Sequence, residues 1–267
     1  LGFGKMEIDQ PFFVTGFDNA PSTVKAGIAQ GLVGAAAGYI GVHLLGDTTP
    51  WLQLVLPGQI EPSADAAGLI HVVGPRFEAP DNLNRLHEDQ LLGLSVTAKD
   101  TLEESIVYGL ENGLDVLLLN GNAALGRDWP ELAGPPDLSM MRDAIRILRR
   151  LNREEEIDLL WFGGVRSGTD AAKLIAMGAK SMVLGMTVAL AAGAEIVGDH
   201  ELAFAPDLSE EERGHAVANI LKSASGEASM MARCTGKTNL HNLEPEDMRA
   251  LTLPTAEATD IVLSGKH

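Results

Sequence analysis

Cysteine, aromatic residues and positive charge are all scarce in this chain of 267 residues. The single cysteine, Cys234, has no partner for a disulfide within the chain, and a reducing, cytoplasmic location is expected. Only 20 Lys and Arg residues stand against 37 Asp and Glu residues, and the net charge of −17 repels nucleic-acid phosphates and anionic lipids. We therefore expect no nucleic acid and no membrane among the partners.

Long hydrophobic runs and metal-ligand patterns are also missing. The longest apolar run, residues 31–45, is interrupted by glycines and a histidine and falls short of the roughly 18 residues that a membrane span needs. No group of Cys, His, Asp or Glu has the spacing of a metal site, so none is predicted. The first residues lack the pattern of a signal peptide, and residue 1 is taken as an arbitrary start.

Short apolar runs alternate with helical patterns along most of the chain. This alternation is typical of parallel strands joined by helices, and the continuous hydrophobicity of the runs suits strands that are buried on both faces. An open doubly wound sheet would use similar strands, but eight repeats in about 250 residues favour an α/β fold of the (β/α)8 TIM-barrel type. The eight predicted strands are residues 12–15, 38–44, 52–56, 70–73, 93–96, 116–119, 159–162 and 182–184.

The helix signals divide the chain into two parts. A capping box is expected at Thr101–Glu104, and residues 140–151 form an amphipathic pattern. After the last strand, a second capping box at Ser209–Glu212 predicts a helix through about Ala224, and another helix is expected over 242–251. The predicted division is a barrel over residues 1–195 and a C-terminal helical extension, packed on the barrel, over residues 196–267.

The strongest chemical signal is a strand, glycine turn, helix, strand, glycine turn pattern over residues 159–187. Glycines at Gly163, Gly164 and Gly185 let backbone amides approach an anion, and the helix that begins near Thr169 directs its positive end to the same space. In a barrel these turns follow the last two strands, where phosphate groups commonly bind. The alternative is that the glycines only turn the chain and that Arg166 pairs with an acidic neighbour.

Several segments resemble one known family. Residues 162–185, Phe-Gly-Gly-Val-Arg-Ser-Gly-Thr-Asp-Ala-Ala-Lys-Leu-Ile-Ala-Met-Gly-Ala-Lys-Ser-Met-Val-Leu-Gly, are similar to the FMN phosphate-binding region of glutamate synthases and of the related N-methylglutamate synthase subunit. Residues 213–222 and 232–252 are similar to the C-terminal segment of stand-alone FMN-binding members of that family. Residues 111–121 and 10–14 resemble the strand before its catalytic loop and its first strand.

The resemblance implies an FMN-binding barrel that reduces a 2-imino acid, formed from a 2-oxo acid and ammonia or an amine, to an amino acid. It implies that the residues that hold the cofactor are Thr15, Gly163, Gly164, Arg166, Ser167, Gly185, Met186 and Thr187. Lys99 and Asn120 are the candidates for catalysis, although Lys99 lies out of register with the family's flavin lysine and Asn120 begins the altered loop 120–126.

The family's glycine-rich loops near the flavin ring are altered, and the lone cysteine cannot hold an iron–sulfur cluster. The leading hypothesis is therefore a flavin subunit that takes electrons from a partner in a heteromeric enzyme, with a homologous barrel subunit and a glutaminase-like subunit as further partners. One alternative is a catalytically degenerate barrel that scaffolds or regulates such an enzyme. Another is a barrel that binds a different phosphorylated metabolite.

Overall fold

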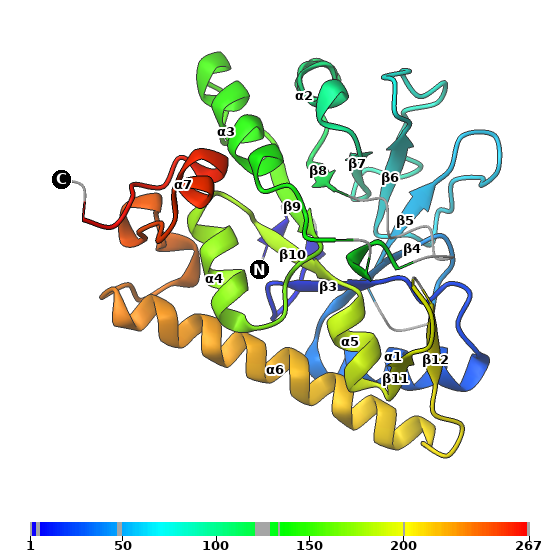
Figure 1. The fold of residues 1–267 in the computed structure, drawn as a ribbon. Helices are drawn as coiled ribbons and strands as arrows, with labels where there is room; N and C mark the ends of the chain where they lie inside the picture. The colour runs from blue at the N-terminus through cyan, green and yellow to red at the C-terminus, as the bar shows by residue number, and fades with distance from the viewer. Residues whose placement is uncertain are drawn as a thin grey trace.

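The computed structural model describes residues 2–3, 6–46, 50–120, 129–132, 134–199 and 201–265. Eight parallel strands close into a TIM barrel in the order β10-β3-β4-β5-β6-β7-β8-β9 (Figure 1), so the predicted fold is confirmed. Each predicted strand overlaps an observed one, and the second, predicted over 38–44, ends three residues early at Gly41. The barrel strands are β3 (Phe12–Thr15), β4 (Gly38–Gly41), β5 (Trp51–Val55), β6 (Gly68–Val73), β7 (Leu91–Val96), β8 (Val116–Leu119), β9 (Asp158–Phe162) and β10 (Ser181–Leu184).

Alternation of side chains along these strands separates two cores. One set points to the barrel axis and packs there in a cluster that includes Phe13, Leu54 and Phe162. The other set points outward and packs under the helices, in a cluster that includes Tyr39 and Trp161. Nearly every strand residue is buried, which is why the strands read as continuous apolar runs in the sequence.

Helices cover only part of the barrel's outer surface (Figure 1). Two short antiparallel pairs of strands complete the described chain: β1 (Gly2–Phe3) with β2 (Met6–Glu7), and β11 (Ala194–Ile196) with β12 (Leu202–Phe204). In this part of the chain no helix combines the length and hydropathy that are needed to cross a bilayer. The helices are α1 (Ser22–Ala35), α2 (Leu102–Glu111), α3 (Ser139–Leu151), α4 (Gly168–Ala176), α5 (Met186–Ala191), α6 (Glu210–Cys234) and α7 (Leu253–Thr259).

Loops take the place of helices after β5 and after β6. Two buried glutamines hold these loops through hydrogen bonds to backbone groups. Gln53 in β5 accepts from the Ser63 amide at 2.7 Å and donates to the Glu61 carbonyl at 3.1 Å. Gln90 donates to the carbonyls of Ser63 and Ala66, each at 2.9 Å. The two side-chain amides thus provide hydrogen-bond partners for backbone groups of the loops, which lie outside the helices and the sheet.

The long helix α6 lies against α1, α4 and α5 along one side of the barrel (Figure 1). Its crossing with α1 is close because both helices carry glycines there. A Cβ on Gly27 would lie 2.7 Å from Cβ of Arg213, and a Cβ on Gly31 would lie 2.5 Å from Cβ of Val217. The C-terminal segment therefore packs on the first helix of the barrel through backbone contact.

Local helix signals were only partly correct. The capping box at Ser209–Glu212 is confirmed, and its helix α6 continues ten residues beyond the expected end at Ala224 to Cys234. The prediction of a capping box at Thr101–Glu104 is wrong. A 3-10 turn precedes α2, and the Thr101 hydroxyl donates to the Ala98 carbonyl instead. The helix expected over 242–251 is also wrong: only short 3-10 turns form there.

Candidate functional site

The chain turns sharply after β9 at two glycines. Gly163 and Gly164 have φ angles of 92° and 71°, which are in the left-handed region that favours glycine. A Cβ on Gly164 would lie only 2.7 Å from Pro136. The indole of Trp161 donates to the Gly163 carbonyl at 2.9 Å and stabilises the turn. The backbone geometry therefore requires glycine at both positions.

The start of α4 already has its hydrogen-bond partners within the chain. Ser167 is the N-cap and accepts a hydrogen bond from the Asp170 amide. Glu227 from α6 accepts from the Gly168 amide at 2.8 Å and from the Thr169 hydroxyl at 2.5 Å. The guanidinium of Arg166 is 84% exposed and lies 3.2 Å from the Asp170 carboxylate, as the alternative interpretation of this arginine expects.

A carboxylate of the chain itself lies between the turns after β9 and β10. The Met186 amide donates a hydrogen bond to Oε2 of Glu131 at 2.6 Å, and the Gly164 amide bonds the same carboxylate. A Cβ on Gly185 would lie 2.5 Å from Oε2, so the absence of a side chain there leaves room for this oxygen. We call the backbone amides of Gly164 and Met186, together with the neighbouring Gly185, the anion nest.

Burial raises the pKa of the Glu131 carboxyl, and the hydrogen bonds from Met186 and Gly164 act against that rise. Trp129, two residues earlier, packs beside it. The Trp129 ring meets the Phe17 ring edge-on at a centroid distance of 5.6 Å. A Cβ on Gly16 would lie 2.9 Å from the Trp129 ring, and one on Gly185 would lie 3.2 Å from it. Trp129 and Glu131 together cover the ends of β3 and β10.

A cavity of about 650 Å³ opens beside the anion nest. Five of the predicted cofactor-binding residues line it, and the side chains of Glu131, Asp170 and Lys173 add two acids and one base. Thr187 contributes its backbone more than its hydroxyl, which donates to the Val165 carbonyl at 2.6 Å. The five residues are Gly163, Gly164, Arg166, Met186 and Thr187.

Thr15 lies apart from this cavity, inside the barrel. The pairing register places Thr15 and Ser95 in one layer of inward-facing side chains from alternate strands, on opposite sides of the axis. Both hydroxyl groups are fully buried, and neither has a hydrogen-bond partner among the described residues. They form a small polar layer below the mouth of the barrel.

A buried acid that the sequence reasoning missed follows β3. Asp18 accepts a hydrogen bond from the His43 amide at 2.8 Å, and the Tyr39 hydroxyl, which accepts from the Phe17 amide at 3.1 Å, lies beside it. Burial raises the pKa of Asp18, and the His43 amide opposes the rise. Burial likewise raises the pKa of Tyr39. Both groups are therefore harder to ionise than they are in water, and both lie beside the end of β3.

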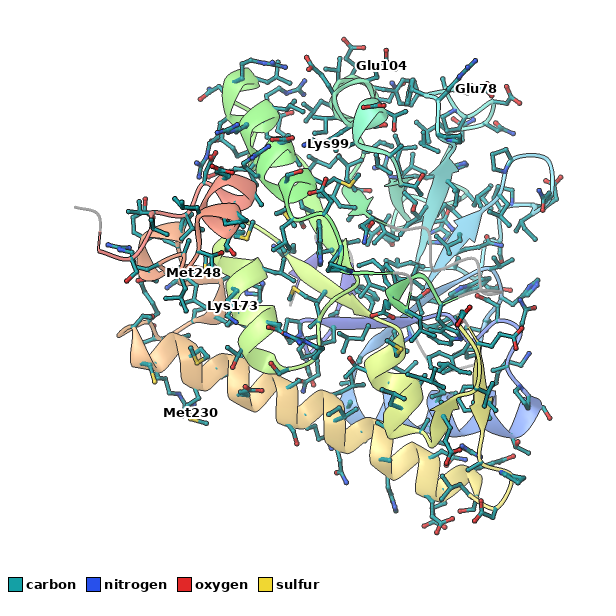
Figure 2. All side chains as sticks on the ribbon, in the orientation of Figure 1. Glu78, Lys99, Glu104, Lys173, Met230 and Met248 are labelled. Carbon is teal, nitrogen blue, oxygen red and sulfur yellow. The ribbon has the colours of Figure 1, made fainter. Side chains whose placement is uncertain are left out.

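The two candidate catalytic residues lie in different places. Lys99 follows β7 and lies between α2 and α3 (Figure 2), where it pairs with the Asp143 carboxylate at 2.7 Å and with the Ser139 hydroxyl at 2.7 Å. It does not line the 650 Å³ cavity. Asn120 is at the end of β8, has a φ of 60° and donates to the Phe162 carbonyl at 3.0 Å. Asn120 therefore adjoins the glycine turn, whereas Lys99 is held by α3.

Glu131 and Trp129 were missed because the segment after β8 has no periodic pattern. The signal available was a tryptophan and an acid on the two sides of Pro130, in the sequence Asp128-Trp-Pro-Glu-Leu-Ala-Gly-Pro-Pro. The altered loop 120–126 lies outside the described residues except for Asn120. Within the described ranges, no group of three or more His, Cys, Asp or Glu side chains could hold a metal ion.

Comparison with known proteins gives one related sequence and many related folds. No family model matches the chain. The chain is 32% identical over 194 residues to a "Glutamate synthase large subunit-like protein" of Rhizobium meliloti (strain 1021), a match that covers 57% of this chain and 42% of that protein. The chain therefore spans less than half the length of this relative.

The solved structures that resemble the chain are barrels at low sequence identity. A flavocytochrome b2 double mutant with pyruvate bound has a TM-score of 0.62 at 16% identity, over 100% of this chain and 77% of that chain. A mandelate oxidase mutant with a monooxide FMN adduct has a TM-score of 0.60 at 16% identity, over 90% of this chain and 79% of that chain. At this identity the likeness establishes the fold alone.

Proposed function

We propose that this chain is an FMN-binding barrel of a glutamate-synthase-like oxidoreductase. The observation that carries the proposal is the anion nest, in which the amides of Met186 and Gly164 both bond the Glu131 carboxylate at the carboxyl ends of β9 and β10. A phosphate group bound after the last two strands is common in TIM barrels. The two amides define a position for an acceptor oxygen, and the Glu131 carboxylate occupies that position in this structure.

The residues of the nest fit the phosphate end of FMN. Gly163, Gly164 and Gly185 present no Cβ, so phosphate oxygens can approach the amides. The adjoining cavity of about 650 Å³ is within the usual range of roughly 300–1,000 Å³ for small-ligand sites. Arg166 would add a positive charge if its guanidinium, which is 84% exposed, turned from Asp170 to the phosphate.

Bound FMN would supply the transfer of electrons from a donor to the substrate. The proposed reaction is reduction of a 2-imino acid, formed from a 2-oxo acid and ammonia or an amine. Its support is the resemblance of the sequence to glutamate synthases, together with a relative whose name carries that activity. Because the chain spans 42% of that relative, an electron donor and an ammonia-supplying subunit are proposed as separate partners.

The chain's own residues near the ring end are few. Asn120 lies at the end of β8, where its side chain donates to the Phe162 carbonyl, and the Thr15 hydroxyl is fully buried inside the barrel. Lys99 is held by Asp143 and Ser139, so we propose no catalytic role for it. Neither Asn120 nor Thr15 carries a charge, so neither could stabilise a reduced ring as a cation would.

A second candidate function is a catalytically degenerate barrel that scaffolds or regulates a heteromeric enzyme. The observation that favours it is Glu131, whose carboxylate lies where a phosphate would bind. The pairing of Lys99 with Asp143 agrees with it as well.

One experiment separates the two functions. The absorbance spectrum of the purified protein is recorded with FMN added, the flavin is reduced with dithionite, and 2-oxoglutarate with ammonium or methylamine is then mixed in without oxygen. Reoxidation of the flavin on mixing supports the oxidoreductase. Flavin that binds and stays reduced, or that does not bind, supports the scaffold. Greater stabilisation by sugar phosphates than by FMN would point to another phosphorylated ligand.

A further inference from the structure

The segment that carries Trp129 and Glu131 fills the predicted phosphate site from within the chain. The Leu132 amide donates to the Trp129 carbonyl at 2.8 Å in a short 3-10 turn, so the two side chains are held by one compact piece of backbone. Glu131 enters the anion nest, and Trp129 covers Gly16 and Gly185. We call these two side chains the plug.

A phosphate group and the plug cannot share the nest. Oε2 of Glu131 already takes the Met186 amide at 2.6 Å, and the Gly164 amide bonds the same carboxylate. A phosphate monoester carries a charge of about −1.5 to −2 at neutral pH, so it would repel an ionised Glu131 at this distance. Either the plug leaves before the phosphate enters, or the phosphate does not bind.

Two other donors at this site already have partners within the chain. The Gly168 amide at the start of α4 is taken by Glu227, and Arg166 is paired with Asp170. Among the residues that the structure describes, no cation pairs with the acid that holds the Gly164 and Met186 amides. Displacement of Glu131 is therefore the step on which entry of the ligand depends.

We propose that Glu131 is the residue that sets the affinity and selectivity of this site, as an internal competitor that a phosphate-bearing ligand must displace together with Trp129. The inference rests on the proposed function for the identity of the ligand as FMN. The competition itself requires only a phosphate group. This competition makes Glu131 a specificity-determining residue. A ligand that lacks a phosphate forms no hydrogen bonds with the nest amides that could offset the loss of their hydrogen bonds to Glu131.

The test measures binding of FMN, and separately of inorganic phosphate, to the full chain and to Glu131→Ala and Glu131→Gln. We expect both ligands to bind at least about tenfold more tightly to Glu131→Ala, and Glu131→Gln to lie between, because its neutral amide can still accept from the nest. Glu104→Gln removes one negative charge on the exposed side of α2 (Figure 2) and controls for net charge. Trp129→Phe tests the second half of the plug: phosphate should shift tryptophan emission more in the wild type than in this variant, which keeps Trp161 beside the glycine turn.

The outcomes separate the inference from the proposed function. Equal affinity of wild type and Glu131→Ala for both ligands would overturn the plug and leave FMN binding intact. Tighter binding of phosphate by Glu131→Ala, with FMN bound by no variant, would uphold the plug and overturn the cofactor. If Glu104→Gln gained as much affinity as Glu131→Ala, the effect would be one of net charge and the inference would be overturned. The inference would also be overturned if neither ligand bound to any variant.

Discussion

Glu227 in α6 accepts a hydrogen bond from the backbone amide of Gly168 at 2.8 Å, although 59 positions separate the two residues. Its other oxygen accepts from the Thr169 hydroxyl at 2.5 Å. A side chain of the C-terminal segment therefore completes the start of a barrel helix, where backbone amides otherwise lack partners. Hydrogen bonds from Thr169 and Gly168 hold the pKa of Glu227 below its usual value of 4.5.

Glu227→Gln should lower the melting temperature at pH 7, since an ionised acceptor bonds these donors more strongly than an amide does. The folded pKa is depressed, so the stabilisation by the carboxylate is present above pH 4.5 and is lost as the pH falls through the folded value. Thermal unfolding at several pH values checks this, with Glu104→Gln as the control. A difference from wild type that stays constant down to pH 3 would contradict it.

Asp18→Asn should have the opposite dependence on pH. Burial raises the pKa of Asp18 above 3.8, so its contribution is fully present below that value and is lost as the pH rises through the folded pKa. An asparagine can still accept from the His43 amide and carries no charge. Denaturant titrations from about pH 4 to 7 should show the variant gaining stability relative to wild type as the pH rises. A variant that loses stability relative to wild type over this interval would refute the prediction.

Gly185→Ala should weaken FMN binding by about tenfold or more while the protein still folds. The φ of Gly185 is −115°, so alanine brings no left-handed strain, and its Cβ would lie 2.5 Å from the oxygen position in the anion nest. Flavin fluorescence gives the affinity. Gly226→Ala in α6 is the matched control, because a Cβ there meets nothing within 4 Å. Unchanged affinity in Gly185→Ala would exclude the nest as the phosphate site.

Gln53→Leu should destabilise the fold by about 1–3 kcal/mol or more, because leucine leaves the Ser63 amide and the Glu61 carbonyl without their partner. Gln59, an exposed glutamine in the same loop, provides the control, and Gln59→Leu should change the free energy of unfolding by less than about 0.5 kcal/mol. Urea titration measures both. Equal effects of the two substitutions would show that Gln53 does not hold the loop.

The barrel was predictable because its strands are buried on both faces, which makes each of them a short apolar run in the sequence. The helix expected over 242–251 failed because capping residues and a proline favour the first turn only, and no apolar stripe there continues it. The glycine turns were found from their composition. Glu131 was not, since a carboxylate enters the nest only after β8, β9 and β10 have been brought together.

The crossing of α1 with α6 has a consequence for the order in which the protein is made. The glycines of α1 that accept α6, Gly27 and Gly31, are synthesised almost 190 residues before Arg213 and Val217 of their partner helix. Strand β3 likewise waits for β10 to close the barrel. Contacts at such separation form slowly, since loop closure must precede them. On the ribosome, the first helix and strand would therefore remain without their final partners until the C-terminal third has emerged.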